Sequence, residues 1–561
     1  MADQGWTVDA TAHTITFFEP PANAAAISVK QYAQGGVNAT SLWAAGAWGT
    51  LTGYPGEVEY FAGRLWFAGT QDRPQTIWTS KISNYSSFGK SVPTADDDAI
   101  TATLTAKQVN AITDLLPLKD MVMLTTGAEW KVAGGSNNVI TPSTVSFSPQ
   151  SNYGASDLPG LVVGDSGLFV QGRGAYVRDI GYQFAVDSYT GNDLTVFASH
   201  LVQGHTIIDW AYQQTPFSVV WAVRDDGVLL GLAYMREQQV MGWFHCDSIN
   251  GFVESVCSVA EGTEDAVYLI VRRVINGATV RYVERLESRF FSDQRDCFFV
   301  DAGLSYDGRS TALAPGATMT LTGGTTWMGD ENLTLTCSSG VFAASNIGDW
   351  VKLYADTVDA NGAPETVMKP VKITGYTSAT VVTVRPVGLI DTALRAAALA
   401  TWDFCPLTFS GLDHLEGQTV ACLADGNVKP RQTVTSGSIT LDYPAAVVHI
   451  GLPIQADFET LEVNALGQES VRDRRKAITK VSLIVTQSRG AKIGKDADHL
   501  REAKSRRVSD GYYNPNSLQN DLIEAYIDAD WDTKGRVFVR QDDPLPLTIL
   551  GLIADVSVAG G

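Results

Sequence analysis

The fold is indicated most clearly by Ser218-Val-Val-Trp-Ala-Val-Arg-Asp-Asp-Gly-Val-Leu-Leu-Gly-Leu-Ala-Tyr-Met235, which lies within residues 205–289. Two runs rich in Val, Leu and aromatic residues are separated there by Asp225-Asp226-Gly227. Asp-Gly favours a tight hairpin, because a type I′ turn needs positive φ at both central positions. The run from Ser218 to Val223 is apolar on both faces, which is typical of a strand buried between two layers. The stretch therefore predicts a β-hairpin inside a layered β-protein.

Similar runs continue along the chain. They include Val240-Met-Gly-Trp-Phe-His245 and Val267-Tyr-Leu-Ile-Val-Arg-Arg273, and a second hairpin signal follows at Asn276-Gly277. Strand clusters repeat with a period of roughly 40 residues, which is the size of one propeller blade. The sequence therefore predicts an all-β fold: a β-propeller with an inserted small β-rich domain and additional C-terminal β structure.

Four regions are expected along the chain. Residues 1–50 are predicted to form an N-terminal β segment, 51–303 the propeller blades, 304–408 the inserted β-rich domain, and 409–561 a returning propeller or platform region. Residues 304–408 differ from their neighbours because they are rich in Thr, Ala and Gly and their strand runs are weaker. The composition of residues 95–110 and of the Ala-rich residues 391–401 is compatible with short helices.

Composition limits the class of protein. The 561 residues are 45% hydrophobic and 18% charged, which is ordinary for a folded domain. No apolar window of about 18 residues suggests a transmembrane helix, and the N-terminus lacks the features of a secretory signal. The six cysteines lack the Cys-x-x-Cys spacing of a metal knuckle, so free thiols are expected; they are Cys246, Cys257, Cys297, Cys337, Cys405 and Cys422.

Charge is unevenly distributed. The net charge is −20, but residues 471–510, the basic segment, contain 12 Lys and Arg against five Asp and Glu. The rest of the chain contains 29 basic and 56 acidic residues, a balance of −27. Because affinity for nucleic acid comes mainly from neutralising phosphates, such an acidic body argues against tight DNA binding. The basic segment is a candidate contact with an acidic partner or with DNA, or it pairs with the acidic body of another copy of the chain. The candidate contact residues are Arg472, Arg474, Arg475, Lys476, Arg501, Lys504, Arg506 and Arg507.

Several stretches resemble the tail nozzle (tail tubular protein B-like) proteins of short-tailed bacteriophages. The similarity covers roughly residues 54–300 and 408–500 as diffuse blade motifs. The stretches are Tyr54-Pro-Gly-Glu-Val-Glu-Tyr-Phe-Ala-Gly-Arg-Leu-Trp-Phe-Ala-Gly-Thr70, Val240-Met-Gly-Trp-Phe-His245, Val253-Glu-Ser-Val256, Tyr268-Leu-Ile-Val-Arg-Arg273, Arg281-Tyr-Val-Glu-Arg-Leu-Glu287 and His414-Leu-Glu-Gly-Gln-Thr-Val-Ala-Cys-Leu-Ala-Asp-Gly426.

The resemblance implies a structural subunit of a phage tail. Such a subunit forms a homo-oligomeric ring, a hexamer, at the distal end of the tail, and genome DNA is ejected through its channel without tight binding. The implied partners are further copies of the chain, a tail adaptor ring, and tail fibres or spikes. The implied location is the virion, after assembly in the cytoplasm of the host bacterium. The inserted domain, 304–408, is a candidate for the nozzle tip.

Motifs that mimic catalytic sites have simpler explanations. Gly164-Asp-Ser-Gly167 matches part of a serine-protease nucleophile loop but reads as a hairpin turn, and a serine nucleophile needs a histidine base and an oxyanion hole. Gly89-Lys90-Ser91 lacks the upstream glycine of a phosphate loop. Asp96-Asp97-Asp98 lacks the spacing of a calcium loop, and the seven histidines are scattered. The sequence thus predicts no catalytic, cofactor-binding or metal-binding residues, and a protein that is not an enzyme.

An alternative function stays open at this point: a carbohydrate-binding or carbohydrate-active propeller that recognises a host surface polysaccharide. Its candidate stacking residues are Trp43, Trp48, Trp66 and Trp78, although large aromatics in blades mostly fill the space between neighbouring sheets. A carbohydrate-active enzyme would also need two carboxylates placed across a cleft. A propeller scaffold for partner proteins is a third alternative.

Overall fold

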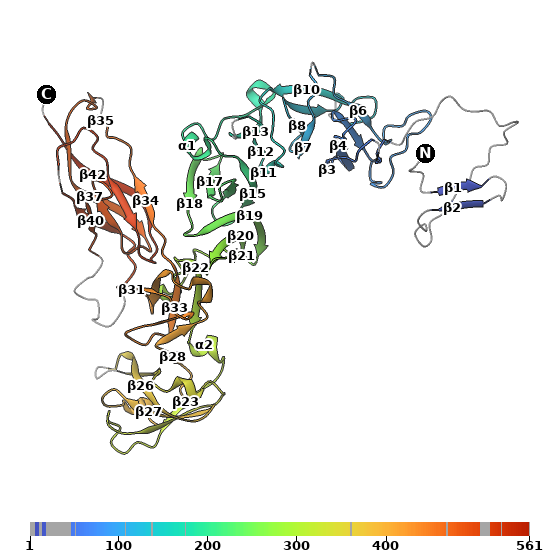
Figure 1. Cartoon of the computed structure of the whole chain (residues 1–561). Helices are drawn as coiled ribbons and strands as arrows, with labels where there is room; N and C mark the ends of the chain where they lie inside the picture. The colour runs from blue at the N-terminus through green and yellow to red at the C-terminus, as the bar shows by residue number, and fades with distance from the viewer. Residues whose placement is uncertain are drawn as a thin grey trace. The chain divides into compact units, whose positions relative to one another are not determined.

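The computed structural model describes residues 6–9, 14–17, 47–50, 52–106, 108–135, 139–173, 176–358, 362–466, 469–504, 516–528 and 530–559. The chain divides into a first unit, residues 1–247 and 252–271, and a second unit, residues 248–251 and 272–561. Nearly all of the regular structure is antiparallel β (Figure 1), which confirms the predicted all-β, propeller-like class. Within the described ranges, no helix has the length and apolar character needed to cross a bilayer.

The first unit contains four successive four-stranded antiparallel sheets (Figure 1). The first sheet consists of β3 (Glu57–Phe61), β4 (Arg64–Ala68), β5 (Thr76–Thr79) and β6 (Thr101–Thr103). The second consists of β7 (Ile112–Pro117), β8 (Met121–Thr125), β9 (Glu129–Ala133) and β10 (Ser146–Ser151). The third consists of β11 (Leu161–Val163), β12 (Ser166–Val170), β13 (Val177–Gln183) and β14 (Ser188–Thr190), and the fourth of β15 (Ile207–Gln213), β16 (Val219–Arg224), β17 (Leu229–Met235) and β18 (Val240–Cys246).

Each of these sheets is a meander in which neighbours in sequence are neighbours in the sheet, as in a propeller blade. A two-stranded hairpin precedes them, β1 (Trp6–Asp9) and β2 (Thr14–Phe17). A three-stranded sheet follows, with β19 (Gly251–Glu261), β20 (Glu264–Ile275) and β21 (Ala278–Arg285). Helices are few and short: η1 (Phe184–Val186), α1 (Ser199–Val202), η2 (Gln294–Asp296), α2 (Ser310–Leu313), η3 (Ala344–Asn346), η4 (Thr392–Leu394) and η5 (Asp413–Leu415).

The predicted hairpin turns are confirmed at two places. β16 and β17 pair from Val219↔Ala233 to Val223↔Leu229, and Gly227, with φ of 84°, lies in the turn between them. Asp225 and Asp226 do not have positive φ, so the hairpin is present but its turn is not type I′. Asn276 and Gly277 have φ of 49° and 79° between β20 and β21, as a type I′ turn requires. Blade cores form between the hairpins from alternate side chains, and Trp210, Val220, Leu232 and Tyr234 share one buried cluster.

The second unit contains a sheet that the inserted region interrupts. This sheet has the order β22 (Asp301–Asp307), β33 (Val447–Leu452), β30 (Thr419–Ala424) and β31 (Asn427–Thr433). Between β22 and β30 the chain forms a separate six-stranded sheet, yellow in Figure 1. Its order is β23 (Met319–Thr322), β24 (Leu333–Cys337), β27 (Val381–Pro386), β26 (Pro364–Ser378), β25 (Trp350–Val358) and β28 (Trp402–Cys405). The six-stranded sheet has its own buried core around Leu335, Leu353, Val384 and Trp402.

The C-terminal part of the second unit is built from two further sheets. One has the order β34 (Ala456–Glu459), β41 (Phe538–Gln541), β38 (Lys492–Gly494) and β39 (Leu500–Glu502), and the other has the order β40 (Leu522–Tyr526), β37 (Lys476–Thr486) and β42 (Thr548–Val558). Val481, Leu483, Ile493 and Val539 belong to one buried cluster shared by the two sheets. The unit also contains two small two-stranded sheets, β29 (Thr408–Ser410) with β32 (Ser438–Thr440), and β35 (Ala465–Leu466) with β36 (Glu469–Ser470).

Some local predictions were wrong. Residues 95–110 contain the strand β6 and no helix where the structure describes them, and residues 391–401 contain only the short η4. The six cysteines are free thiols, as predicted, with Cys246 and Cys257 exposed and the other four buried.

Candidate functional site

The most elaborate polar cluster in the second unit lies where the inserted region leaves and rejoins its flanking sheet. At this joint the Gly308 N–H donates to Ala446 O at 2.8 Å, and the Phe404 N–H donates to Gly308 O at 2.8 Å. Arg309 and Asp403 face each other in an isolated antiparallel bridge. A Cβ at position 308 would lie 2.0 Å from Phe404 O, so only glycine fits this approach. The outgoing and returning strands are therefore held together at one narrow neck.

An ion pair crosses from the inserted sheet to the flanking sheet. Lys352 on β25 lies 2.6 Å (Nζ to Oδ2) from Asp425, and each side chain is 20% exposed. The other carboxylate oxygen of Asp425 accepts the Ala446 and Val447 N–H groups at 3.0 and 2.9 Å. Asp425 and Gly426 form the Asp-Gly turn between β30 and β31, with φ of 47° and 73°. The turn thus places the Asp425 carboxylate at the joint. One of its oxygens contacts Lys352 of the inserted sheet, and the other accepts hydrogen bonds from the backbone of the flanking sheet.

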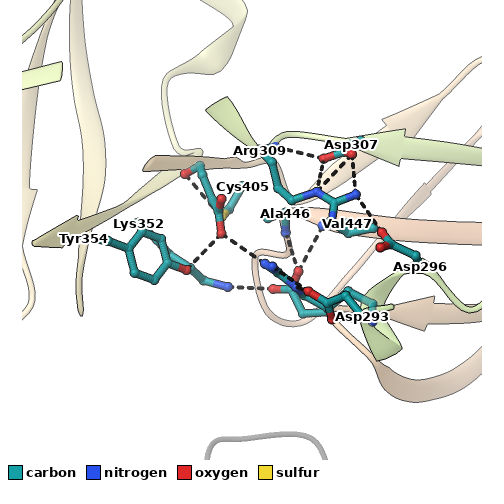
Figure 2. Close-up of polar contacts among 12 residues, drawn as sticks. Asp293, Asp296, Asp307, Arg309, Lys352, Tyr354, Cys405, Ala446 and Val447 are labelled. Atoms are coloured by element: carbon teal, nitrogen blue, oxygen red, sulfur yellow. Dashed lines mark hydrogen bonds and ion pairs between the residues drawn. The ribbon is translucent and has the colours of Figure 1, made fainter. Parts of the chain in front are cut away.

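Two arginines extend the network on the flanking side. Figure 2 shows the Arg309 guanidinium between Asp307 and Asp296, and its Nη2 lies 2.6 Å from an oxygen of each. Hydrogen bonds to Asp307 and Asp296 raise the pKa of Arg309. Arg295 lies 2.8 Å from Asp293 and 3.5 Å from Asp403, so it links η2 to β28 of the inserted sheet.

Asp403 and Cys405 are the buried titratable groups at the centre. Burial raises the pKa of Asp403, although the Tyr354 hydroxyl, which donates to it at 2.8 Å, and Arg295 counteract this rise. Burial also raises the pKa of the Cys405 thiol, which is fully buried. A nucleophilic cysteine needs a lowered pKa and access, so Cys405 has the properties of a structural thiol. The arrangement is suited to fixing the inserted sheet in one orientation against its flanking sheet.

A hydroxyl–imidazole contact lies in the same flanking sheet. Ser305 Oγ is 2.6 Å from His449 Nδ1, and His449 Nε2 is 2.8 Å from Arg295 O. Since the carbonyl can only accept, Nε2 carries the proton and Nδ1 accepts from the serine. Burial lowers the pKa of His449. Ser305 and His449 are direct cross-strand neighbours in the β22–β33 register, so strand pairing accounts for the contact.

Several cations of the basic segment pair with carboxylates that come later in the chain. Residues 521–543 contain seven Asp and Glu against three Lys and Arg. Lys480 lies 2.6 Å from Glu524, Lys492 lies 2.5 Å from Asp542, and Lys495 pairs with Asp530. Part of the local excess of +7 is therefore balanced within the second unit itself.

The predicted contact residues have different environments. Lys476 is 1% exposed, and its ammonium donates to the carbonyls of Arg472, Arg474 and Thr533, which corrects the expectation of a surface contact for this residue. Arg501 is exposed and pairs with Asp528 at 2.5 Å. Arg472, Arg475 and Lys504 are also exposed, Arg474 is half-buried, and Arg506 and Arg507 lie outside the described residues.

A second cluster joins residues that are distant in sequence. His205 Nδ1 lies 3.0 Å from Asp225 and Nε2 lies 3.7 Å from Asp226, and the potential ligand atoms of the three residues are all within 4.8 Å of one another. Sequence inspection missed this group because the histidine precedes β15 while the carboxylates lie in the β16–β17 turn. Arg224 pairs with Asp226, so ion pairs within the group account for its geometry.

The tryptophans proposed to stack on sugars are mainly structural. Trp66 and Trp78 are 0% and 4% exposed, Trp48 is half-buried, and Trp43 lies outside the described residues. Exposed aromatics occur instead at Tyr60 and Tyr85, whose ring centroids are 5.2 Å apart.

Comparison with known proteins assigns no family. No protein-family model and no curated protein matches the chain. Among solved structures, human WBSCR16 is similar at 12% identity and a TM-score of 0.26, covering 60% of this chain and 87% of that one. A luciferin-regenerating enzyme matches at 10% identity and 0.24, covering 60% and 95%. Raptor of Chaetomium thermophilum matches at 10% identity and 0.24, covering 60% and 28%. TM-scores this low transfer no function to the chain.

One expectation is corrected by these comparisons. The sequence predicted a protein that is not an enzyme, but the luciferin-regenerating enzyme, one of the similar structures, is an enzyme. The prediction is therefore withdrawn. The same comparison assigns no reaction and no catalytic residue to this chain.

Proposed function

We propose that the chain is a structural subunit of the tail nozzle of a short-tailed bacteriophage. In this proposal several copies form a ring in the virion, attached to a tail adaptor ring and to fibres or spikes, and the genome leaves through its channel. The proposal begins from the resemblance of residues 54–300 and 408–500 to such proteins. The ring number of six comes from that resemblance alone.

One observation supports the proposal beyond the resemblance: several cations of the basic segment pair with carboxylates of the same unit, which lowers the positive charge that the segment presents to DNA. Lys480, Lys492 and Lys495 each have a carboxylate partner, and Lys476 is buried. The first unit has 26 Asp and Glu against 12 Lys and Arg, so its excess of carboxylates adds to the negative field. An acidic wall repels phosphates and lets DNA pass without adhering.

The joint suits the same role. A domain held by Lys352–Asp425, Arg295–Asp403 and the glycine neck keeps a fixed orientation under load. We propose the inserted sheet as the nozzle tip for this reason.

Electron microscopy tests the proposal directly. Negative-stain images of purified protein should show a ring with a central channel, and immunogold labelling should place the chain at the distal end of phage tails. A protein that stays monomeric at high concentration and is absent from purified virions would contradict the proposal.

Recognition of a host polysaccharide is a second candidate, supported by the exposed pair of Tyr60 and Tyr85. Exposed aromatic rings stack on sugars. Binding on a glycan array that Tyr60→Ala and Tyr85→Ala abolish would favour it, whereas no binding to any glycan would exclude this surface.

A further inference from the structure

The three-stranded sheet β40-β37-β42 has an unusual solvent-facing side. Its inner face packs into the core through Val481, Leu483 and Ile523. Its outer face presents Ile484, Leu522, Tyr526, Leu550 and Ile553, which are between 39% and 67% exposed. An antiparallel sheet with one buried face normally has a polar opposite face. Here the exposed apolar side chains share the outer face with Lys480, Glu524 and Asp555. An exposed apolar patch beside charged residues indicates a surface that a partner covers.

Both edges of this sheet are open. β37 is central, and β40 and β42 pair with it at either side. In the part of the chain that the structure describes, no strand pairs with the other edge of β40 or of β42. Unpaired edges present rows of N–H and C=O groups that can pair with another chain.

The edge of β42 also lacks the usual protection. The register shifts at Leu550, but Gly551 to Val558 is uninterrupted on its own side and contains no Lys, Arg or Pro. Its only charge, Asp555, lies opposite Lys480. By contrast, the edge strand β31 contains Lys429, Pro430 and Arg431, which are residues that discourage edge pairing.

The charges on the two edges are compatible with joining. Tyr526, Lys480 and Asp555 form one row across the sheet, and Glu524, Ser482 and Ile553 form the next. Lys480 pairs with Glu524 at 2.6 Å and neighbours Asp555, so one cation serves both edges. If each row of cross-strand neighbours continues from β42 of one copy into β40 of another, Asp555 lies opposite Tyr526 of that copy and Ile553 lies opposite its Glu524. The two carboxylates are then not opposite each other.

We propose that β42 of one copy pairs with β40 of the next, so that this sheet continues from subunit to subunit. The inference rests on the proposed function, because it names the surface through which the copies of a ring join. Both edges belong to one sheet and differ from each other, so the contact is head-to-tail, which is the type that closes into rings. Since β40 and β42 both run antiparallel to β37, the new pair is parallel. The outer apolar face of one copy becomes continuous with that of the next.

The test uses full-length protein and two edge-blocking variants, Ile553→Glu on β42 and Leu522→Lys on β40. Ile553→Glu places a second carboxylate opposite Glu524 of the next copy, and like charges directly opposite each other destabilise strand pairing. Both positions are exposed, and unchanged circular dichroism melting will check that each variant is folded. Size-exclusion chromatography with light scattering should show an oligomer larger than a dimer for the wild type and monomers for each variant. Leu461→Lys, at a residue 88% exposed in the same unit, is the matched control and should behave like the wild type.

Mixing the two variants distinguishes the geometry. Each variant retains one usable edge, so an equimolar mixture should form dimers and nothing larger. If Leu522→Lys still assembles like the wild type while Ile553→Glu does not, β42 pairs with itself and the head-to-tail contact is wrong. If rings with a channel persist in both variants, the nozzle proposal stands and this contact falls. If the wild type forms oligomers that both variants disrupt but that show no channel, the contact stands and the nozzle proposal falls. A monomeric wild type overturns the contact, and virion labelling then decides the nozzle role separately.

Discussion

Carboxylates in the two units have opposite surroundings. In the first unit, Glu57 on β3 is influenced by the like charges of Asp114 and Asp157, and burial together with these neighbours raises the pKa of Glu57 to about 7. In the second unit, Asp425 and Asp307 have cationic partners at 2.6 Å. Acidic composition alone therefore does not define an acidic surface, because these carboxylates of the second unit form ion pairs with cationic side chains. The first unit leaves some of its carboxylates against one another.

The largest effect is expected at the joint. Asp425→Ala removes the partner of Lys352 and leaves the Ala446 and Val447 N–H groups without their acceptor. Breaking a largely buried pair from one side typically costs about 3 kcal/mol or more. The free energy of unfolding of the second unit, measured by urea titration, should fall by about that amount. The double variant Lys352→Met/Asp425→Ala should recover part of the loss, and a loss under about 1 kcal/mol would show that the joint is not held by this pair.

A smaller, pH-dependent effect is expected in the first unit. Because the folded-state pKa of Glu57 is raised from 4.5 to about 7, its stabilising contribution is fully present below about pH 4.5 and is lost as pH rises through 7. Glu57→Gln should therefore melt like the wild type at pH 4 and be more stable at pH 8. Each pKa unit corresponds to about 1.4 kcal/mol. Because Glu57 is only half-buried, solvent screening reduces the expected gain to roughly 1–2 kcal/mol.

The matched variant Asp157→Asn sharpens this test. Removing a like charge beside Glu57 should lower the pKa of Glu57 and stabilise the first unit at pH 8 in the same direction, by less. Equal stability of wild type and both variants across pH 4–8 would mean that these carboxylates do not interact.

DNA binding should be weak despite the composition of the basic segment. At about 0.15 M salt, where screening acts within about 8 Å, we expect no submicromolar binding of duplex DNA in a fluorescence anisotropy assay. Any binding at low salt should depend on the exposed Arg472, Arg475 and Lys504. Arg475→Glu should reduce the slope of log affinity against log salt by about 1. Submicromolar binding at 0.15 M that survives this reversal would mean that the second unit grips DNA.

The smallest effect is expected for the exposed ion pair of Arg501 and Asp528, whose side chains are 56% and 59% exposed. Exposed pairs contribute little because water screens them. Arg501→Ala should change the free energy of unfolding by less than about 0.5 kcal/mol, against the much larger effect at Asp425. If Arg501→Ala and Asp425→Ala lowered the free energy of unfolding by similar amounts, the exposed pair and the pair at the joint would not differ in strength.

Local sequence signals predicted local structure well. Asp226-Gly227 and Asn276-Gly277 form the expected hairpin turns because turn geometry depends on adjacent residues. The six-stranded sheet, Met319–Cys405, lies within the predicted range 304–408. However, β22 extends to Asp307 and pairs with β33, so an insertion boundary at residue 304 cuts through a strand. Strand endings depend on the partner strand, and that partner lies 140 residues later.

Long-range partners explain what the sequence could not reveal. Lys352 and Asp425 are 73 residues apart, and no local pattern links them. The charge of the basic segment was misjudged for the same reason, because the carboxylates that pair with several of its cations lie in residues 521–543. Ala-rich residues 391–401 formed only η4, since packing of Ile390, Leu394 and Leu399 into the core of the inserted sheet overrode helix propensity.

The neck at Gly308 has a practical consequence. Arg309 and Asp403 are bridge partners, so the two ends of the segment between them lie side by side. Any independently folding cargo whose own termini are close together, such as a reporter protein, can be spliced between these positions without stretching either flanking strand. The neck is therefore a grafting point at which one compact module can be exchanged for another, provided that the new module supplies a cation for Asp425 in place of Lys352.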